Sequence, residues 1–483
     1  MISSYISAVK NTFLVMLVNK NKKYIIIMLC AVLVLTGLYF LIDFMPDSTD
    51  TASEANESIQ LADIEIYDIS KVNIKNEKGE FSVSVKTVTD SEGEKSAVCT
   101  VDGYNEAPIM ETLPNTIAKD CTTLTAHRRV NKLGADDAEY GLDSPVSEVT
   151  VTLADAAEIK LKIGSEAPNT EARYVGFEND GTVYLVDSEN LQSFMYGIYD
   201  IMDPTVIESG GDEFISLTVE NNTCSEPVVI EISADARHSS VYNIISPIKR
   251  TANNDTVNTV AKNVRSFTAD KVVAYNANAS QIKEYGLDKP YASVTALYDD
   301  STVKLMASKP HADGNVYLTV QGKNMVYQAK SDALPWIDAS ITDLKDSVIL
   351  SPNFKELKTV MLQISDNTYR FDISFNEYTD DNGDLKTETA VTLGDKNVDS
   401  AQFKRLIKYA SSAETTAQPT ETSVSGAPTL KITYVYSNKE LENDVLEIYS
   451  SGTGKAIAVL NGVIDSYAYD TYVSRIISDL AEF

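Results

Sequence analysis

The chain has 483 residues, too many for one compact core, so two or three domains are expected. Its 70 acidic side chains outnumber the 41 basic ones, and the net charge of −29 argues against binding to nucleic acid or to anionic lipid headgroups, which need a basic surface. Four cysteines without any C-x-x-C spacing argue against a zinc site and a disulfide framework, although one bridge among Cys99, Cys121 and Cys224 stays open beside free thiols.

The first feature along the chain is an apolar run that predicts a transmembrane helix. Residues 24–42, from Tyr24 to Ile42, number 19 and would form about 28 Å of helix, close to the ~30 Å hydrocarbon core of a bilayer. Lysines precede the run and acidic residues follow it, so residues 1–23 are expected in the cytoplasm and the bulk of the chain outside, as a single-pass protein of the cell membrane. A cleaved signal peptide is the alternative, but it would have a shorter apolar core and small residues at its cleavage site, whereas bulky residues follow this run. The acidic residues 43–61 hold few apolar side chains and are expected to form a flexible tether.

A motif repeated at an offset of 145 residues indicates internal duplication. The seven residues from Glu139 to Pro145 (EYGLDSP) return from Glu284 to Pro290 (EYGLDKP). Before each copy, apolar residues at the i, i+4, i+7 spacing predict a helix, and after it apolar residues alternate as in strands. The helix positions are Ile117, Cys121 and Leu124 in the first copy and Val260, Val264 and Phe267 in the second.

The match continues to the end of each copy. Tyr174 and Tyr184 correspond to Tyr317 and Tyr327 at an offset of 143 residues. At the same offset, Ser188 and Ser331 are expected to be the N-caps of short helices.

A third, degraded copy is expected to finish the chain. Residues 401–410 have the apolar pattern of the helix, alternating strands follow, and Ser466 is expected to cap a last helix. The Tyr-Gly-Leu-Asp turn is missing, and the Thr- and Ser-rich residues 411–428 occupy its place.

These elements define the predicted fold class and domains. The chain is expected to be α+β and strand-rich, with an N-terminal transmembrane helix followed by two to three tandem α+β repeats with antiparallel sheets. Repeat 1 is expected at residues 62–205, repeat 2 at 206–345 and a degenerate repeat 3 at 346–483.

The duplicated motif has a structural explanation that is favoured over ligand contact by Asp143 or Asp288. Glycine allows the positive φ of a tight turn, leucine is buried, the tyrosine ring packs with its hydroxyl at the surface, and proline begins the next strand. The residues of this structural motif are Tyr140, Gly141, Leu142, Asp143 and Pro145 in the first copy and Tyr285, Gly286, Leu287, Asp288 and Pro290 in the second.

No coherent catalytic, metal-binding or cofactor-binding set emerges, so the chain is expected not to be an enzyme and no cofactor or metal is assigned. Ser246 and Lys249 fit an S-x-x-K motif and residues 365–367 fit S-D-N, but no K-T-G completes the set. Residues 380–384 are similar to a calcium loop, yet Tyr378 and Thr389 occupy the positions where such a loop needs acidic ligands. A hairpin tip is therefore favoured there.

The chain resembles the family known as domain of unknown function 4340. The resemblance is carried by the duplicated motif of residues 137–145 and by the strands that follow it, and it covers most of residues 64–338. It implies a bacterial protein associated with ABC-type transport systems of the gliding-motility or envelope-export kind, and it assigns no catalytic residues.

The chain is expected to be a membrane-anchored, extracytoplasmic scaffold or accessory subunit of an ABC-type envelope transport complex. It would bind protein partners in the envelope, and an ABC permease is a candidate partner. One alternative is a module that binds glycan, peptide or a cation, and matching clefts in two repeats would favour it. A hydrolase is a weaker alternative, which a buried pair of histidine and carboxylate in a pocket would support.

Overall fold

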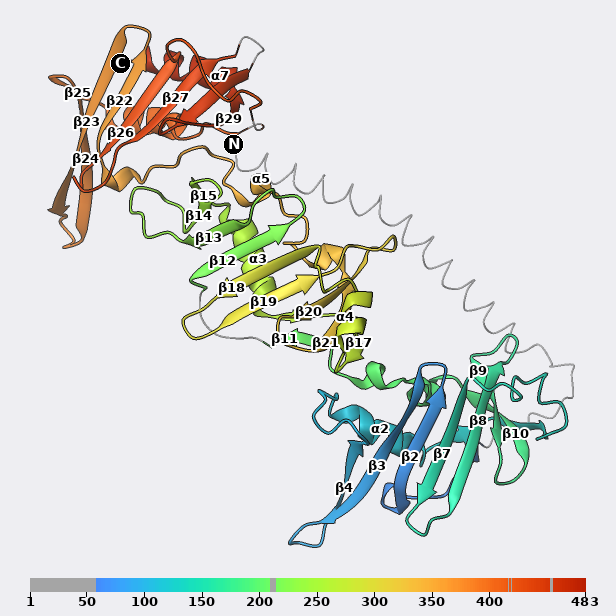
Figure 1. Cartoon of the computed structure of the whole chain (residues 1–483). Helices are drawn as coiled ribbons and strands as arrows, with labels where there is room; N and C mark the ends of the chain where they lie inside the picture. The colour runs from blue at the N-terminus through green and yellow to red at the C-terminus, as the bar shows by residue number, and fades with distance from the viewer. Residues whose placement is uncertain (1–57, 209–213, 416, 418, 452–454) are drawn as a thin grey trace, which may run out of the picture.

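The computed structural model describes residues 58–208, 214–415, 417, 419–451 and 455–483. They form three large antiparallel sheets that follow one another along an elongated body, together with two small two-stranded sheets (Figure 1). We call these parts unit 1, unit 2 and unit 3, after the sheets that begin at β2, β12 and β22.

Unit 1 contains an eight-stranded sheet in the order β4-β3-β2-β7-β8-β9-β10-β6. Its elements are β1 (Ile59–Gln60), η1 (Ile66–Asp68), β2 (Ile69–Asn76), β3 (Gly79–Thr89), β4 (Lys95–Val101), α2 (Thr112–Asp120), β5 (Thr125–Ala126), β6 (Arg128–Lys132), β7 (Ser147–Leu153), β8 (Glu158–Glu166), β9 (Ala172–Phe177), β10 (Thr182–Asp187) and η2 (Glu189–Met195). The predicted tether reaches residue 61, but its last residues are ordered, since β1 pairs with β5 and Leu61 is buried.

Unit 2 contains a nine-stranded sheet in the order β15-β14-β13-β12-β18-β19-β20-β21-β17. It follows the connecting helix η3 (Ile198–Ile201), and its elements are β11 (Thr205–Ile207), β12 (Ser216–Asn221), β13 (Val228–Ile232), β14 (Tyr242–Ser246), β15 (Arg250–Thr251), α3 (Asn254–Arg265), β16 (Phe267–Thr268), β17 (Lys271–Tyr275), α4 (Ala279–Glu284), β18 (Ala292–Leu297), β19 (Thr302–Ala307), β20 (Asn315–Val320), β21 (Met325–Lys330), η4 (Ser331–Ala333) and α5 (Ile341–Leu344).

Unit 3 contains an eight-stranded sheet in the order β25-β24-β23-β22-β26-β27-β28-β29. Its elements are η5 (Phe354–Glu356), β22 (Leu357–Ile364), β23 (Asn367–Thr379), β24 (Leu385–Leu393), β25 (Lys396–Val398), α6 (Ser400–Ala410), β26 (Leu430–Tyr436), β27 (Asp444–Ser450), β28 (Lys455–Leu460), β29 (Val463–Tyr469) and α7 (Asp470–Leu480).

The three sheets share one topology, and the predicted tandem repetition is confirmed for the first two units. Each sheet consists of two antiparallel meanders, and a helix lies between them in the sequence. The initial strands of the two meanders pair with each other at the centre of the sheet, as β2 with β7, β12 with β18 and β22 with β26. In units 1 and 2 the strand after the helix closes the far edge of the sheet, as β6 on β10 and β17 on β21. In unit 3 an isolated β-bridge between Ala417 and Tyr467 of β29 occupies the corresponding edge of the sheet.

Helices cover one face of each sheet because apolar residues alternate along the strands. In β26, for example, Leu430, Ile432 and Tyr434 are buried and alternate with half-buried residues. In α3 the buried residues are Val257, Val260 and Val264, the spacing of one helix face.

The helices begin where the sequence supplies a cap. The Asn253 side chain accepts hydrogen bonds from the backbone N–H groups of Asp255 and Thr256 at the start of α3. Asp399 caps α6 in the same way by accepting from the N–H of Ala401.

The fold-class prediction is corrected in one respect, because it included a transmembrane helix. No helix in the described residues is long and apolar enough to cross a bilayer. The longest of these helices, α3, has 12 residues and spans about 18 Å, against a hydrocarbon core of ~30 Å. The predicted span at residues 24–42, the N-terminal residues 1–23 and all but the end of the tether lie outside the described residues.

Candidate functional site

The two Tyr-Gly-Leu-Asp turns have the same backbone geometry. Gly141 has φ 69° and Gly286 has φ 72°, and the leucine that follows each glycine is buried. Tyr140 packs against Tyr174 with ring centroids 4.8 Å apart, and their counterparts Tyr285 and Tyr317 lie 4.7 Å apart. Asp143 and Asp288 are exposed, as is Pro290, whereas Pro145 is half-buried. This geometry gives the turns a packing role.

The three serines expected as N-caps lie in different surroundings. Ser188 precedes η2 but its side chain makes no capping hydrogen bond, and Ser331 is the first residue of η4 rather than its cap. The prediction for Ser466 is wrong, since this residue is buried within β29 and the last helix begins at Asp470. The strand extends past Ser466 because Ala468 also alternates into the core.

A cluster of polar and charged side chains joins unit 2 to unit 3, and the sequence pattern did not predict it. His238 lies in the loop between β13 and β14, and its Nε2 is 2.9 Å from Oδ2 of Asp444, the first residue of β27. Tyr436 Oη donates to Oδ2 of Asp444 at 2.6 Å, and Asn461 Nδ2 donates to Oδ1 at 2.9 Å. Arg237 lies beside the same carboxylate, with Nη1 3.4 Å from Oδ1. We call these five residues the joint cluster.

The joint cluster keeps Asp444 ionised. Burial by itself would raise the pKa of Asp444, whose side chain is 1% exposed, but hydrogen bonds from His238, Tyr436 and Asn461 outweigh burial and lower the pKa from 3.8 to about 2. Burial and the neighbouring carboxylate raise the pKa of Tyr436, so its hydroxyl stays a donor.

A second buried ion pair strengthens the same joint. Arg250 of β15 pairs with Asp465 of β29, and its Nη2 donates to the backbone carbonyls of Asp346 at 3.2 Å and Val348 at 3.0 Å. Lys345 is buried next to this pair, and burial lowers its pKa. Unit 2 and unit 3 are therefore held together largely by buried polar groups.

The joint between units 1 and 2 is apolar by contrast. Ile201, Met202 and Val206 are buried in the segment that connects the two units. Tyr104 of unit 1 lies 6.1 Å from Tyr275 of unit 2, measured between ring centroids.

The pair of His238 and Asp444 is the arrangement that would support a hydrolase, and its surroundings argue for a different role. Both ring nitrogens face carboxylates, since Nδ1 is 3.8 Å from Asp235 Oδ2 while Nε2 contacts Asp444. A base in a catalytic pair needs one nitrogen directed at a nucleophile or substrate. The histidine instead links a loop of unit 2 to a strand of unit 3.

The other candidate motifs do not assemble into a site. Ser246 ends β14 in unit 2, whereas Ser365 and Asp366 form the turn between β22 and β23 in unit 3 and Asn367 begins β23. Cys99, Cys121 and Cys224 are free thiols. In the residues that the structure describes, no three His, Cys, Asp or Glu side chains are grouped as a metal site.

Residues 380–384 form a hairpin tip, and an equivalent tip occurs in unit 1. Asp380 Oδ1 accepts from the backbone N–H groups of Asn382 and Asp384, just as Asp90 Oδ1 accepts from those of Glu92 and Glu94. The two aspartates are 290 residues apart, twice the offset of the duplicated motif. This relation between units 1 and 3 is visible in the sequence as two matching T-D-x-x-G segments.

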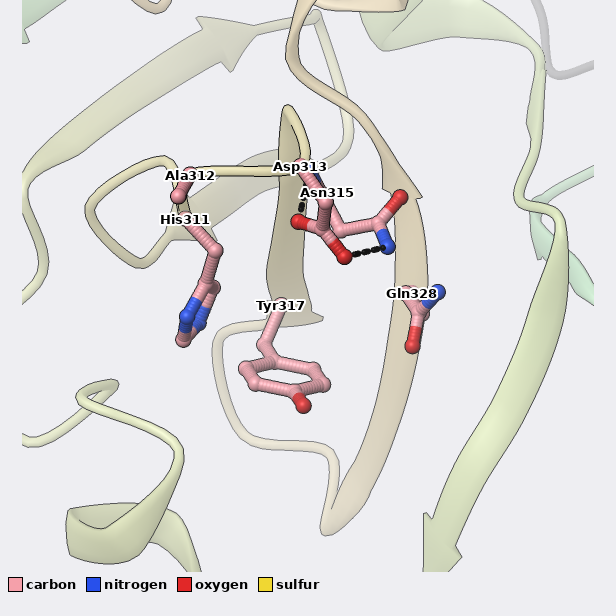
Figure 2. Close-up of a pocket in the computed structure, with 6 residues that line it drawn as sticks. All are labelled: His311, Ala312, Asp313, Asn315, Tyr317 and Gln328. Carbon is pink, nitrogen blue, oxygen red and sulfur yellow. Dashed lines mark hydrogen bonds between the residues drawn. The ribbon is translucent and has the colours of Figure 1, made fainter.

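Unit 2 also carries a cavity of about 350 Å³, beside the packed tyrosines of its turn. Figure 2 shows Tyr317 between His311 and Gln328, with a hydrogen-bonded pair of Asp313 and Asn315 nearby. In unit 1, Ala172 and Leu185 correspond in strand register to Asn315 and Gln328. These two residues form a small apolar cluster with Tyr174, which fills the matching place. Two of the strand residues that line the cavity in unit 2 are therefore matched in unit 1 by buried apolar residues.

Comparison with known proteins gives one match. The family model described as Domain of unknown function (DUF4340) matches residues 100–236 and 243–424, about two thirds of the chain. No curated protein and no solved structure matches.

Proposed function

Because the chain belongs to the family described as Domain of unknown function (DUF4340), we propose that it is an extracytoplasmic scaffold or accessory subunit of an ABC-type transport complex of the cell envelope. It would act by binding other proteins along its three sheets. The link to ABC-type transport comes from the family resemblance, and the mode of action comes from the architecture.

The observation that carries the proposal is a row of three large antiparallel sheets, each covered by helices on one face and carrying polar, ion-paired side chains on the other face of its central strands. Cross-strand ion pairs occupy the polar faces, as between Lys75 and Glu148 in unit 1, Lys304 and Glu220 in unit 2, and Lys431 and Glu447 in unit 3. Polar sheet faces suit recognition of other proteins by surface contact, and edge strands suit strand addition.

The alternatives receive less support. A ligand-binding module built between repeats would show matching clefts, but the place that is hollow in unit 2 is filled in unit 1. A hydrolase would need an available nucleophile beside its histidine, whereas both ring nitrogens of His238 face carboxylates.

Site-specific photo-crosslinking in intact cells tests the proposal. A photoreactive amino acid would replace Lys86 of β3 or Gln363 of β22, which are both exposed. Lys86 lies an even number of residues after Ser82 and Ser84, opposite to buried Phe81 and Val83, and Gln363 follows buried Leu362, so both belong to the polar faces. Glu189, exposed on η2 at the helix-covered side of unit 1, is the matched control. We expect the two polar-face positions, and not the control, to capture a permease subunit of an ABC-type transporter.

Capture of no envelope transport protein from either polar-face position, in cells where the variants accumulate normally, would contradict the proposal.

A further inference from the structure

The cavity of unit 2 is lined mainly by polar side chains. Its lining residues come from the loop before β20 (His311, Ala312 and Asp313), from β20 (Asn315 and Tyr317) and from β21 (Gln328). A volume of about 350 Å³ is at the small end of natural ligand sites, enough for one side chain or a small molecule.

The polar atoms of the cavity are held in place yet keep unused acceptor capacity. Asp313 accepts from the backbone N–H of Asn315 at 3.0 Å and from its side-chain amide at 2.6 Å. A carboxylate has about four acceptor positions, so two remain. Asn315 Oδ1 is buried without a hydrogen-bond partner in the described part of the chain, and a buried acceptor of this kind normally has one.

Lys330 contacts the loop that carries Asp313 but bonds to its backbone and not to its carboxylate. Lys330 Nζ donates to the backbone carbonyl of Asp313 at 3.3 Å, and its charge, after the hydrogen bonds from Asn315, helps to lower the pKa of Asp313. Asp313 therefore presents a negative charge at neutral pH.

The comparison with unit 1 shows that the cavity is a property of unit 2. At the matching strand positions of unit 1, Ala172 and Leu185 replace Asn315 and Gln328, while the tyrosine is kept as Tyr174. The shared fold tolerates an apolar, filled version of this place, so the polar residues of unit 2 are not needed for folding of the repeat.

We propose that this cavity recognises a guanidinium group. A guanidinium presents five N–H donors on a planar cation, which suits a site with the Asp313 carboxylate, the Gln328 amide oxygen and a tyrosine ring. The group would come from an arginine of a partner protein or from a free guanidinium compound. This recognition goes beyond the scaffold function and can be measured on the purified chain without any transport partner.

Isothermal titration calorimetry with the full chain tests the proposal. The probes are acetyl-arginine amide, a blocked pentapeptide with one central arginine, and the same two compounds with citrulline in place of arginine. Citrulline keeps the shape of the side chain and removes its charge. We expect both arginine probes to bind and both citrulline probes to bind about tenfold more weakly or not at all.

Three variants complete the test. Asp313→Asn keeps the shape of the loop and is expected to weaken arginine binding about tenfold, and Gln328→Leu, which restores the residue of unit 1, should weaken it as well. Asp299→Asn removes an equal charge from an exposed loop outside the cavity and should leave binding unchanged. Far-ultraviolet circular dichroism of each variant checks the fold.

The titrations answer two separate questions, namely whether the cavity recognises a guanidinium group and whether that group comes from a protein or from a free compound. Tighter binding of the pentapeptide than of the amide points to a partner protein, and equal binding points to a free compound; both support guanidinium recognition. Equal binding of citrulline and arginine probes, or identical affinities for the Asp313→Asn and Asp299→Asn variants, would overturn it.

Discussion

At the residue scale, the two turn glycines share a backbone conformation but differ in the space around them. Both have a positive φ, which is strained for any residue with a side chain. A Cβ at Gly141 would lie 2.9 Å from the backbone nitrogen of Ser165, whereas a Cβ at Gly286 would meet nothing closer than Ser308 Cβ at 3.7 Å.

This difference makes the pair a matched experiment. We expect Gly286→Ala to destabilise its turn by about 1–2 kcal/mol through backbone strain alone, and Gly141→Ala to destabilise its turn by more, because a backbone atom must also move. Hydrogen exchange of the amides of Leu142 and Leu287 would measure both effects. Equal destabilisation would show that the contact with Ser165 is relieved without penalty.

Asp444 makes the stability of unit 3 depend on acidic pH. The pKa of Asp444 is lower in the folded state than in the unfolded chain. Its contribution to the free energy of unfolding is therefore complete at pH values above the pKa of the unfolded chain, and it is lost as the pH falls through the pKa of the folded state. A fall from 3.8 to about 2 corresponds to about 2 kcal/mol. We expect the excess stability of the wild type over Asp444→Asn to shrink by about this amount between about pH 5 and pH 2.

Urea unfolding of unit 3 at several pH values would measure that change. The exposed Asp395 of the same unit provides a control, since Asp395→Asn should track the wild type across the range. A constant difference between the wild type and Asp444→Asn would mean that the joint cluster does not hold the carboxylate ionised.

At the element scale, the hairpin formed by the second and third strands of the meander serves different purposes in the three units. In units 1 and 3 the tips between β3 and β4 and between β23 and β24 bond within themselves. In unit 2 the loop between β13 and β14 instead bonds to unit 3, where the N–H of Asn353 donates to Arg237 O at 2.6 Å and the N–H of Ser239 donates to Ser351 O at 3.2 Å.

Shortening these loops should therefore have unequal effects. Replacement of residues 234–240 by a short turn is expected to speed hydrogen exchange of residues 345–353 by about tenfold or more, because the hydrogen bonds across the joint are lost. The matched change, replacement of residues 90–94 in unit 1, should leave that segment unaffected. Similar exchange in both variants would argue that the second ion pair holds the joint without the loop.

At the scale of the whole molecule, the described chain has two main hydrophobic cores rather than three. One continuous cluster of buried side chains extends through units 1 and 2, and a separate cluster fills unit 3. The apolar joint merges the first two cores, whereas the polar joint keeps the third apart. Trp336, the only tryptophan, is fully buried in the first cluster.

The molecule is therefore expected to unfold in two steps. Ile432→Ala in unit 3 should lower the stability of its own step by about 2–5 kcal/mol and leave the fluorescence transition of Trp336 in place. Ile230→Ala, an equally buried residue of unit 2, should shift the fluorescence transition instead. Thermal unfolding followed by fluorescence and circular dichroism separates the two, and coincident shifts would indicate one cooperative body.

The sequence by itself determined the features that depend on local pattern. Burial alternates along a strand and recurs every three to four residues along a helix, so the repeats, their strands and the existence of a helix before each turn were predictable from spacing. The helix ends were not, because Leu124 and Phe267, the last residues of the predicted helix faces, lie beyond the ends of α2 and α3. The turn motif was predictable for a similar reason, because Gly141 and Gly286 are needed where φ is positive. The cap at Ser466 failed because a serine can end a strand, sit within it or cap a helix with the same local pattern.

Only the tertiary structure decided how the units meet and where a cavity opens. His238 and Asp444 are 206 residues apart, and no local pattern brings a loop of one unit onto a strand of the next. Units 1 and 2 share the backbone fold around the cavity, so the side chains at this position decide whether a cavity opens. Contacts of this kind are set by the relative placement of whole sheets, and a one-dimensional pattern does not encode that placement.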